Sequence, residues 1–165
     1  MRLASLIILT VITCSATSRA AELTQLQAGH ILAVAYGQYH GPPSLLDNPP
    51  TVHLTPQEAL RTMYHCPTCV IEGLYLKGEI YIWDELDFAY PYAATVLLHE
   101  YIHHFQEKSK GAITACPDML EREREAYAIQ SNVLTKAGDY IHAHNVNIIS
   151  ASLYCPPTTS ASTTK

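Results

Sequence analysis

The chain has 165 residues, of which 48% are hydrophobic and 15% are charged, and its formal net charge is −5 at pH 7. This length and composition fit one globular domain with a hydrophobic core, and they exclude a chain that is mostly disordered or fibrous. The acidic balance and the lack of a basic run argue against nucleic acid or an anionic membrane as the main partner.

The N-terminus predicts a signal peptide over residues 1–20. Arg2 is followed by an apolar run of about ten residues, and small residues stand at the −3 and −1 positions of a signal-peptidase site at its end. The run is too short to cross a bilayer, because a membrane-spanning helix needs about 20 apolar residues. We therefore expect export to the periplasm or the medium. Residues 11–14 loosely resemble a lipobox, so a lipid anchor on Cys14 is a less favoured alternative.

The first half of the exported chain predicts a helix, a short strand, a second helix and a hairpin. Apolar residues at three- and four-residue steps predict the helix over 22–39. Residues 51–54 fit a short strand, and Thr55 fits the N-cap of the second helix. Residues 70–83 are rich in β-branched and aromatic residues and predict a β-hairpin with its turn at Lys77-Gly78.

The second half predicts three helices, over 91–108, 120–137 and 139–153. This order of elements is typical of the α+β class, as a mainly helical domain with a small antiparallel sheet. We expect one domain over 21–155. Residues 156–165 are rich in threonine and serine and predict a disordered tail.

Four cysteines follow the predicted signal peptide: Cys66, Cys69, Cys116 and Cys155. An even number in an oxidising compartment predicts two disulfides, and all three pairings stay open, including a bridge from Cys116 to Cys66 or Cys69. The C-x-x-C motif of Cys66 and Cys69 also occurs in zinc and redox sites. No second C-x-x-C and no thioredoxin-like pattern accompany it, which favours a structural disulfide.

Residues 99–103 read HEYIH, an H-E-x-x-H motif on a predicted helix. Two histidines four residues apart on a helix lie about 40° apart in projection, so His99 and His103 can bind one metal ion. Glu100 is placed to act on a water molecule rather than on the metal. Zinc lowers the pKa of a bound water to about 7, so Glu100 can accept its proton as general base and deliver it to a leaving amine.

A zinc site needs a third protein ligand. The extended motif H-E-x-x-H-x-x-G-x-x-H is excluded, because Gln106 and Ser109 stand where it requires glycine and histidine. The next predicted helix offers three carboxylates, those of Glu121, Glu123 and Glu125. Glu121 and Glu125 are four residues apart and share a face of the helix, whereas Glu123 points elsewhere.

Glu125 is the predicted third ligand. Small apolar residues follow it and would let this helix approach the first one closely, where a carboxylate without a metal would be costly to bury. Glu121 is the alternative ligand. Glu123 fits a solvated face beside neighbouring arginines. Two imidazoles and one carboxylate favour zinc over manganese.

The two histidines and Glu100, followed by a helix with Glu125-Ala126, resemble the gluzincin type of zinc metallopeptidase in its compact, single-domain form. The stretches 99–106 and 123–130 also resemble small exported bacterial proteins of a domain family with no assigned function. The resemblance implies a zincin-like fold and a peptidase activity with Zn²⁺ as cofactor.

The resemblance also assigns roles to residues. His99, His103 and Glu125 bind the metal, and Glu100 is the catalytic general base. A peptide or protein substrate lies along the strand before the active-site helix, here Glu79–Trp83, as an added β-strand. Two other functions stay open: a zinc-bearing binding or structural module without catalysis and, less favoured, a thiol–disulfide protein.

Hydrolysis also calls for a donor that stabilises the oxyanion on the far side of the metal. Tyr127 follows Glu125 by two residues and therefore points to another face of that helix. The sequence offers four candidates and does not choose among them: Tyr127, Tyr140, His142 and His144.

Overall fold

The computed structural model describes residues 23–155, so the predicted signal peptide, Cys14 and the predicted tail lie outside the described residues. The described chain is mainly helical with one small sheet, which confirms the α+β class. Its elements are α1 (Gln25–Tyr39), the short 3₁₀-helix η1 (Pro43–Leu46), β1 (Val52–Thr55), α2 (Gln57–Met63), β2 (Gly73–Leu76), β3 (Glu79–Trp83), α3 (Pro91–Lys110), α4 (Cys116–Lys136) and α5 (Tyr140–Ser152).

The sheet has three strands in the order β1-β3-β2. The predicted hairpin forms β2 and β3, which pair antiparallel, and the predicted short strand forms β1, which pairs parallel to β3. The sheet is therefore mixed. Because Glu79–Trp83 is the central strand and is paired on both sides, it cannot accept a peptide as a further strand. The prediction of a substrate along this strand is wrong, and β2 is the edge on that side of the sheet.

The turn between β2 and β3 explains why the hairpin forms where the sequence predicts it. Lys77 and Gly78 both have positive φ, at 52° and 84°. Two successive residues with positive φ match the type I′ turn, whose twist fits the twist of the strands that it joins. The start of α2 differs from the prediction: Pro56, not Thr55, is the N-cap, because Thr55 completes β1.

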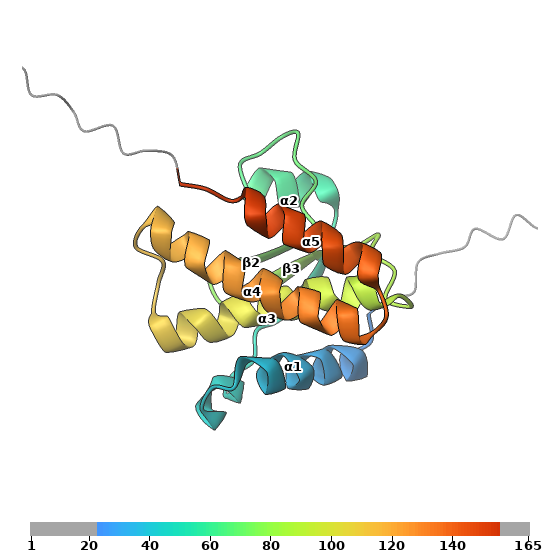
Figure 1. Ribbon diagram of the computed structural model, residues 1–165, viewed down its shortest axis with the longest axis vertical. Coiled ribbons are helices and arrows are strands. Elements are labelled where there is room, and N and C mark those ends of the chain that lie inside the picture. The colour runs from blue at the N-terminus through green and yellow to red at the C-terminus, as the bar shows by residue number, and fades with distance from the viewer. Residues whose placement is uncertain (1–22, 156–165) are drawn as a thin grey trace, which may run out of the picture.

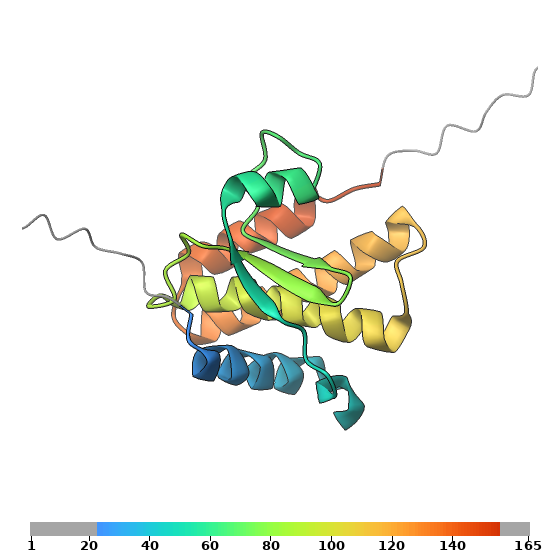
Figure 2. The same ribbon diagram turned by 180° about the vertical axis from the view of Figure 1, so that it is seen from behind.

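Helix α3 is the centre of the fold. Figures 1 and 2 show it between the sheet on one side and α4 on the other, with α1 alongside. Pro91 begins it, where the missing N–H of proline leaves no helical bond unmade, and Gly111 follows its last residue with φ 79°. From the sheet, Ile80 and Ile82 of β3 are fully buried in the core. On α3 the largest fully buried apolar side chains are Leu97, Leu98, Ile102 and Phe105.

Two disulfides are present, as predicted. One joins Cys66 to Cys69, and the other joins Cys116, at the start of α4, to Cys155, just beyond α5. Cys116 is therefore not bridged to Cys66 or Cys69, and its disulfide instead holds the two C-terminal helices together. Such disulfides are typical of an oxidising, extracellular environment. No helix in the described part of the chain has the length and apolar character needed to cross a bilayer.

Candidate metal centre

The two histidines of the H-E-x-x-H motif converge at the side of α3 that meets α4. Nε2 of His99 lies 3.0 Å from Nε2 of His103. The His99 residue is only 6% exposed, and the side chain of His103 is 15% exposed. The one-turn spacing expected from the sequence thus brings both ring nitrogens to one point.

Glu123 of α4 completes a three-residue group with these histidines. Its Oε2 lies 3.4 Å from Nε2 of His99, and its Oε1 lies 3.3 Å from Nε2 of His103. Ligand atoms about 2.0–2.1 Å from a tetrahedral zinc ion stand roughly 3.3 Å from one another. The three groups therefore fit a zinc-sized ion, and they can hold a metal.

The predicted ligand Glu125 lies elsewhere. Its Oε2 is 2.8 Å from Nζ of Lys110 and accepts a hydrogen bond of 3.0 Å from Nε2 of Gln106. Burial raises the pKa of Glu125, but Lys110 and Gln106 outweigh it and lower the pKa overall. The alternative ligand, Glu121, is exposed. The structure thus replaces Glu125 by Glu123 as the carboxylate beside the histidines.

A sequence signal for Glu123 exists, but it is indirect. Glu123, Tyr127 and Gln130 follow one another at steps of four and three residues, so they share one flank of α4. All three contact His99: Glu123 as above, Tyr127 with ring centroids 4.5 Å apart, and Gln130 by a hydrogen bond. Polar and aromatic side chains at this spacing along one flank of α4 are the signal that points to Glu123.

Glutamine side chains orient both histidines. Oε1 of Gln130 is 3.2 Å from Nδ1 of His99, and Oε1 of Gln106 is 2.9 Å from Nδ1 of His103. Gln106 uses its Nε2 to donate to the carbonyl of Arg122, so its Oε1 must accept from Nδ1–H of His103. With Nδ1 of each ring paired to a glutamine oxygen, Nε2 is the nitrogen that would bind a metal. In the metal-free chain, Nε2 of His103 can instead carry a proton toward Glu123.

The electrostatics of the group favour a cation. Burial lowers the pKa of His103, but Glu123 and Glu100 outweigh it and raise the pKa to about 9. Burial raises the pKa of Glu123, but the two histidines outweigh it and hold the pKa well below its usual range. The carboxylates thus stabilise positive charge at this point, whether a proton or a metal ion supplies it.

Glu100 lies beside this group but does not belong to it. It is 6% exposed, and it lines the same cavity as the two histidines. Burial raises its pKa, and this effect exceeds the opposing influence of His99, His103 and the backbone N–H of Tyr75. A carboxylate with a raised pKa beside a metal-binding group is suited to accept a proton.

A cavity of about 550 Å³ opens at the site. It is lined by residues 69–77, which include all of β2, and by α3 and the N-terminal part of α4. Arg122 anchors the α3–α4 connection beside it through Asp118 and the carbonyl of Gly111. Large apolar side chains that are exposed also gather around this cavity: Tyr64, Val70, Leu76, Ile113 and Met119.

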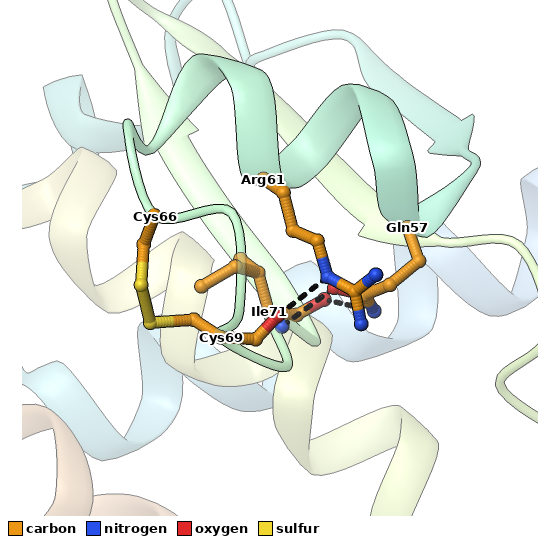
Figure 3. Close-up of a disulfide and its surroundings, with 5 residues drawn as sticks. All are labelled: Gln57, Arg61, Cys66, Cys69 and Ile71. Atoms are coloured by element: carbon orange, nitrogen blue, oxygen red, sulfur yellow. Dashed lines mark hydrogen bonds between the residues drawn. A yellow bond between two sulfur atoms is a disulfide. The ribbon is translucent and has the colours of Figure 1, made fainter.

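Helix α2 holds the segment that leads into β2 (Figure 3). The side chain of Gln57 bonds to both backbone groups of Ile71, accepting from its N–H at 2.8 Å and donating to its carbonyl at 2.9 Å. Arg61 donates to the carbonyl of Cys69 at 2.7 Å, and the Cys66–Cys69 disulfide closes the loop. The C-x-x-C motif therefore supports the wall of the cavity.

Of the four candidates for an oxyanion donor, Tyr127 is the one at the site. Burial and the nearby Glu123 and Glu100 carboxylates raise its pKa, so its hydroxyl stays protonated and can donate. Tyr140 is 68% exposed, and His144 is also exposed. His142 bonds to Asp139 through Nδ1 and stacks on Tyr92.

Comparison of the chain with known protein families, with curated proteins and with solved structures found no match. The interpretation of the site therefore depends on its residues and their geometry.

Proposed function

We propose that this protein is an exported zinc-dependent metallopeptidase of the gluzincin type. The observation that carries the proposal is the convergence of Nε2 of His99, Nε2 of His103 and a carboxylate of Glu123 within 3.0–3.4 Å, with Glu100 in the same cavity. Two imidazoles and one carboxylate form a ligand set that suits catalytic zinc, with a fourth position left for water or substrate. The two disulfides and the N-terminal sequence pattern support export.

Glu100 is the general base of the proposed reaction. A zinc ion at the site would act as a Lewis acid and lower the pKa of a water molecule to about 7. Glu100 accepts the proton of the attacking water and delivers it to the nitrogen of the leaving amine. Its burial excludes bulk water from the carboxylate, and this raises its basicity.

Tyr127 is the proposed donor to the developing oxyanion. Its ring lies against His99, and it lines a small cavity of about 70 Å³ together with Glu100. Since its pKa is raised, the phenol keeps its proton at neutral pH. A preorganised donor of this kind stabilises charge that develops only in the transition state.

Strand β2 is the proposed binding edge for a peptide. Its partner in the sheet is β3 on one side, and it lines the cavity with its whole length. An extended peptide can pair with such an edge through main-chain hydrogen bonds. The exposed apolar side chains around the cavity, including Ile113 and Met119, favour peptides with apolar rather than charged side chains.

The test combines metal analysis with a hydrolysis assay on chain purified without chelator. We expect about one zinc per chain and cleavage in a mixture of unstructured peptides. The variant Glu100→Gln should keep the zinc and lose the cleavage. Absence of zinc in the unmodified chain would contradict the proposal, and zinc without cleavage would favour a binding or structural module.

A further inference from the structure

Gly73, the first residue of β2, lies directly against the side chain of Glu100. A Cβ atom added at Gly73 would stand 2.5 Å from Oε1 of Glu100, 2.9 Å from its Cγ and 3.0 Å from its Cδ. Non-bonded carbon atoms pack at about 3.5–4.0 Å. No residue with a side chain fits at position 73 while Glu100 keeps its place.

The backbone itself does not require glycine at this position. The glycines with positive φ in the described chain are Gly78, Gly111 and Gly138, and Gly73 pairs in register with Ile82 of β3. Glycine within a strand weakens it, and it occurs where another group approaches the backbone closely. The approach of Glu100 is the physical reason for glycine here.

Strand β2 is anchored on both sides of this contact, so it cannot easily give way. Upstream, Gln57 holds both backbone groups of Ile71. Downstream, the hydroxyl of Tyr75 lies 3.3 Å from Nδ1 of His104 on α3. A side chain at position 73 would therefore displace the carboxylate of Glu100 rather than the strand.

We propose that Gly73 is a positioning residue for Glu100. Its missing side chain lets the carboxylate lie against the backbone of β2, facing the N–H of Tyr75, in the cavity that His99 and His103 also line. The base is thereby held at the edge where we propose that the substrate binds. The catalytic part of this inference depends on the proposed peptidase function, whereas the steric coupling of Gly73 to Glu100 does not.

The coupling is tested by a double-mutant cycle in Tm, measured on the full chain in the presence of a chelator. We expect Gly73→Ala to lower Tm by roughly 4 °C or more. In a Glu100→Ala background, Gly73→Ala should change Tm by no more than about 1 °C, because the three colliding atoms of Glu100 are gone. The matched control is Gly37→Ala on α1, where an added Cβ meets nothing within 4 Å; its effect should be the same in both backgrounds.

The catalytic part is tested on the zinc-loaded chain. We expect Gly73→Ala to lower kcat at least about tenfold and to leave the zinc content unchanged. Equal Tm shifts of Gly73→Ala in the two backgrounds, or an unchanged kcat, would overturn the inference. A chain that binds zinc but cleaves no peptide would overturn the proposed function, and the Tm cycle would then still decide whether Gly73 and Glu100 are coupled.

Discussion

Glu123 and Glu125 carry the same side chain on the same helix, two residues apart, and have different partners. Ala126 is fully buried between them and α3, and in projection Glu123 and Glu125 lie about 60° and 100° from it on opposite sides. On one flank Glu123 meets two histidines, and on the other Glu125 meets Lys110. The difference shows that proximity to the partner helix does not by itself identify a ligand candidate, because both flanks of α4 contact side chains of α3 and only one of them faces the imidazoles.

The largest effect is expected from removing each carboxylate in turn. We expect Glu123→Gln to lower zinc affinity by more than about 100-fold, because loss of a mere supporting hydrogen bond already costs 10–100-fold at such sites. The matched change Glu125→Gln should alter affinity by less than about threefold. Competition with a zinc-binding dye measures both. A larger loss with Glu125→Gln would restore that residue as the ligand.

Tyr127 lies on the same flank of α4 as Glu123, and its removal tests whether that flank takes part in catalysis. We expect Tyr127→Phe to lower kcat about 100-fold, the usual effect of removing one oxyanion donor. Its zinc content should not change, since the phenol is not a ligand. The control is Tyr140→Phe on α5, where the ring is 68% exposed. Equal kcat values for the two variants would remove Tyr127 from the mechanism.

In the metal-free chain, the pH dependence of the free energy of unfolding distinguishes the Glu123 flank of α4 from the Glu125 flank. In the folded chain the pKa of His103 is raised from 6.5 to about 9. The stabilisation that protonated His103 gives the fold is therefore fully present below pH 6.5 and is lost as the pH rises through about 9. We expect a loss of about 3 kcal/mol in the free energy of unfolding between pH 6 and pH 9.5, measured with urea and a chelator.

Variants of the two carboxylates provide the control for this pH effect. Glu123→Gln should remove most of the loss, because Glu123 is the main partner that raises the pKa of His103. Glu125→Gln should keep it, because Glu125 is not among the groups that raise the pKa of His103. A flat profile in the unmodified chain would show that His103 is not protonated near pH 7.

The smallest effect is expected at Gln130, which supports His99 from the same flank. We expect Gln130→Leu to weaken zinc binding about tenfold. Nδ1–H of His99 loses its acceptor in this variant, and the ring is no longer held in a fixed orientation. Gln38→Leu is the control, because Gln38 accepts a surface hydrogen bond from Asn132. Unchanged affinity in Gln130→Leu would show that packing alone orients His99.

The sheet gives a second case in which local patterns predict an element but not its place. Residues 70–83 predict the hairpin because strand propensity and the Lys77-Gly78 turn are local properties. Which arm forms the edge depends on β1, which pairs with β3 from about thirty residues earlier in the chain. The pairing of Cys116 with Cys155 is equally non-local, because it depends on α5 returning along α4.

The sequence by itself determines the α+β class, the helix that carries His99, Glu100 and His103, and the next helix as the source of the carboxylate that joins the histidines. These follow from spacings within a few residues, which helix geometry turns directly into shared faces. Only the tertiary structure decides that Glu123 faces the histidines and that β2 is the edge beside them. Those outcomes depend on how separate elements pack against α3, and a periodic pattern shows which residues of a helix are buried without showing what each flank will meet.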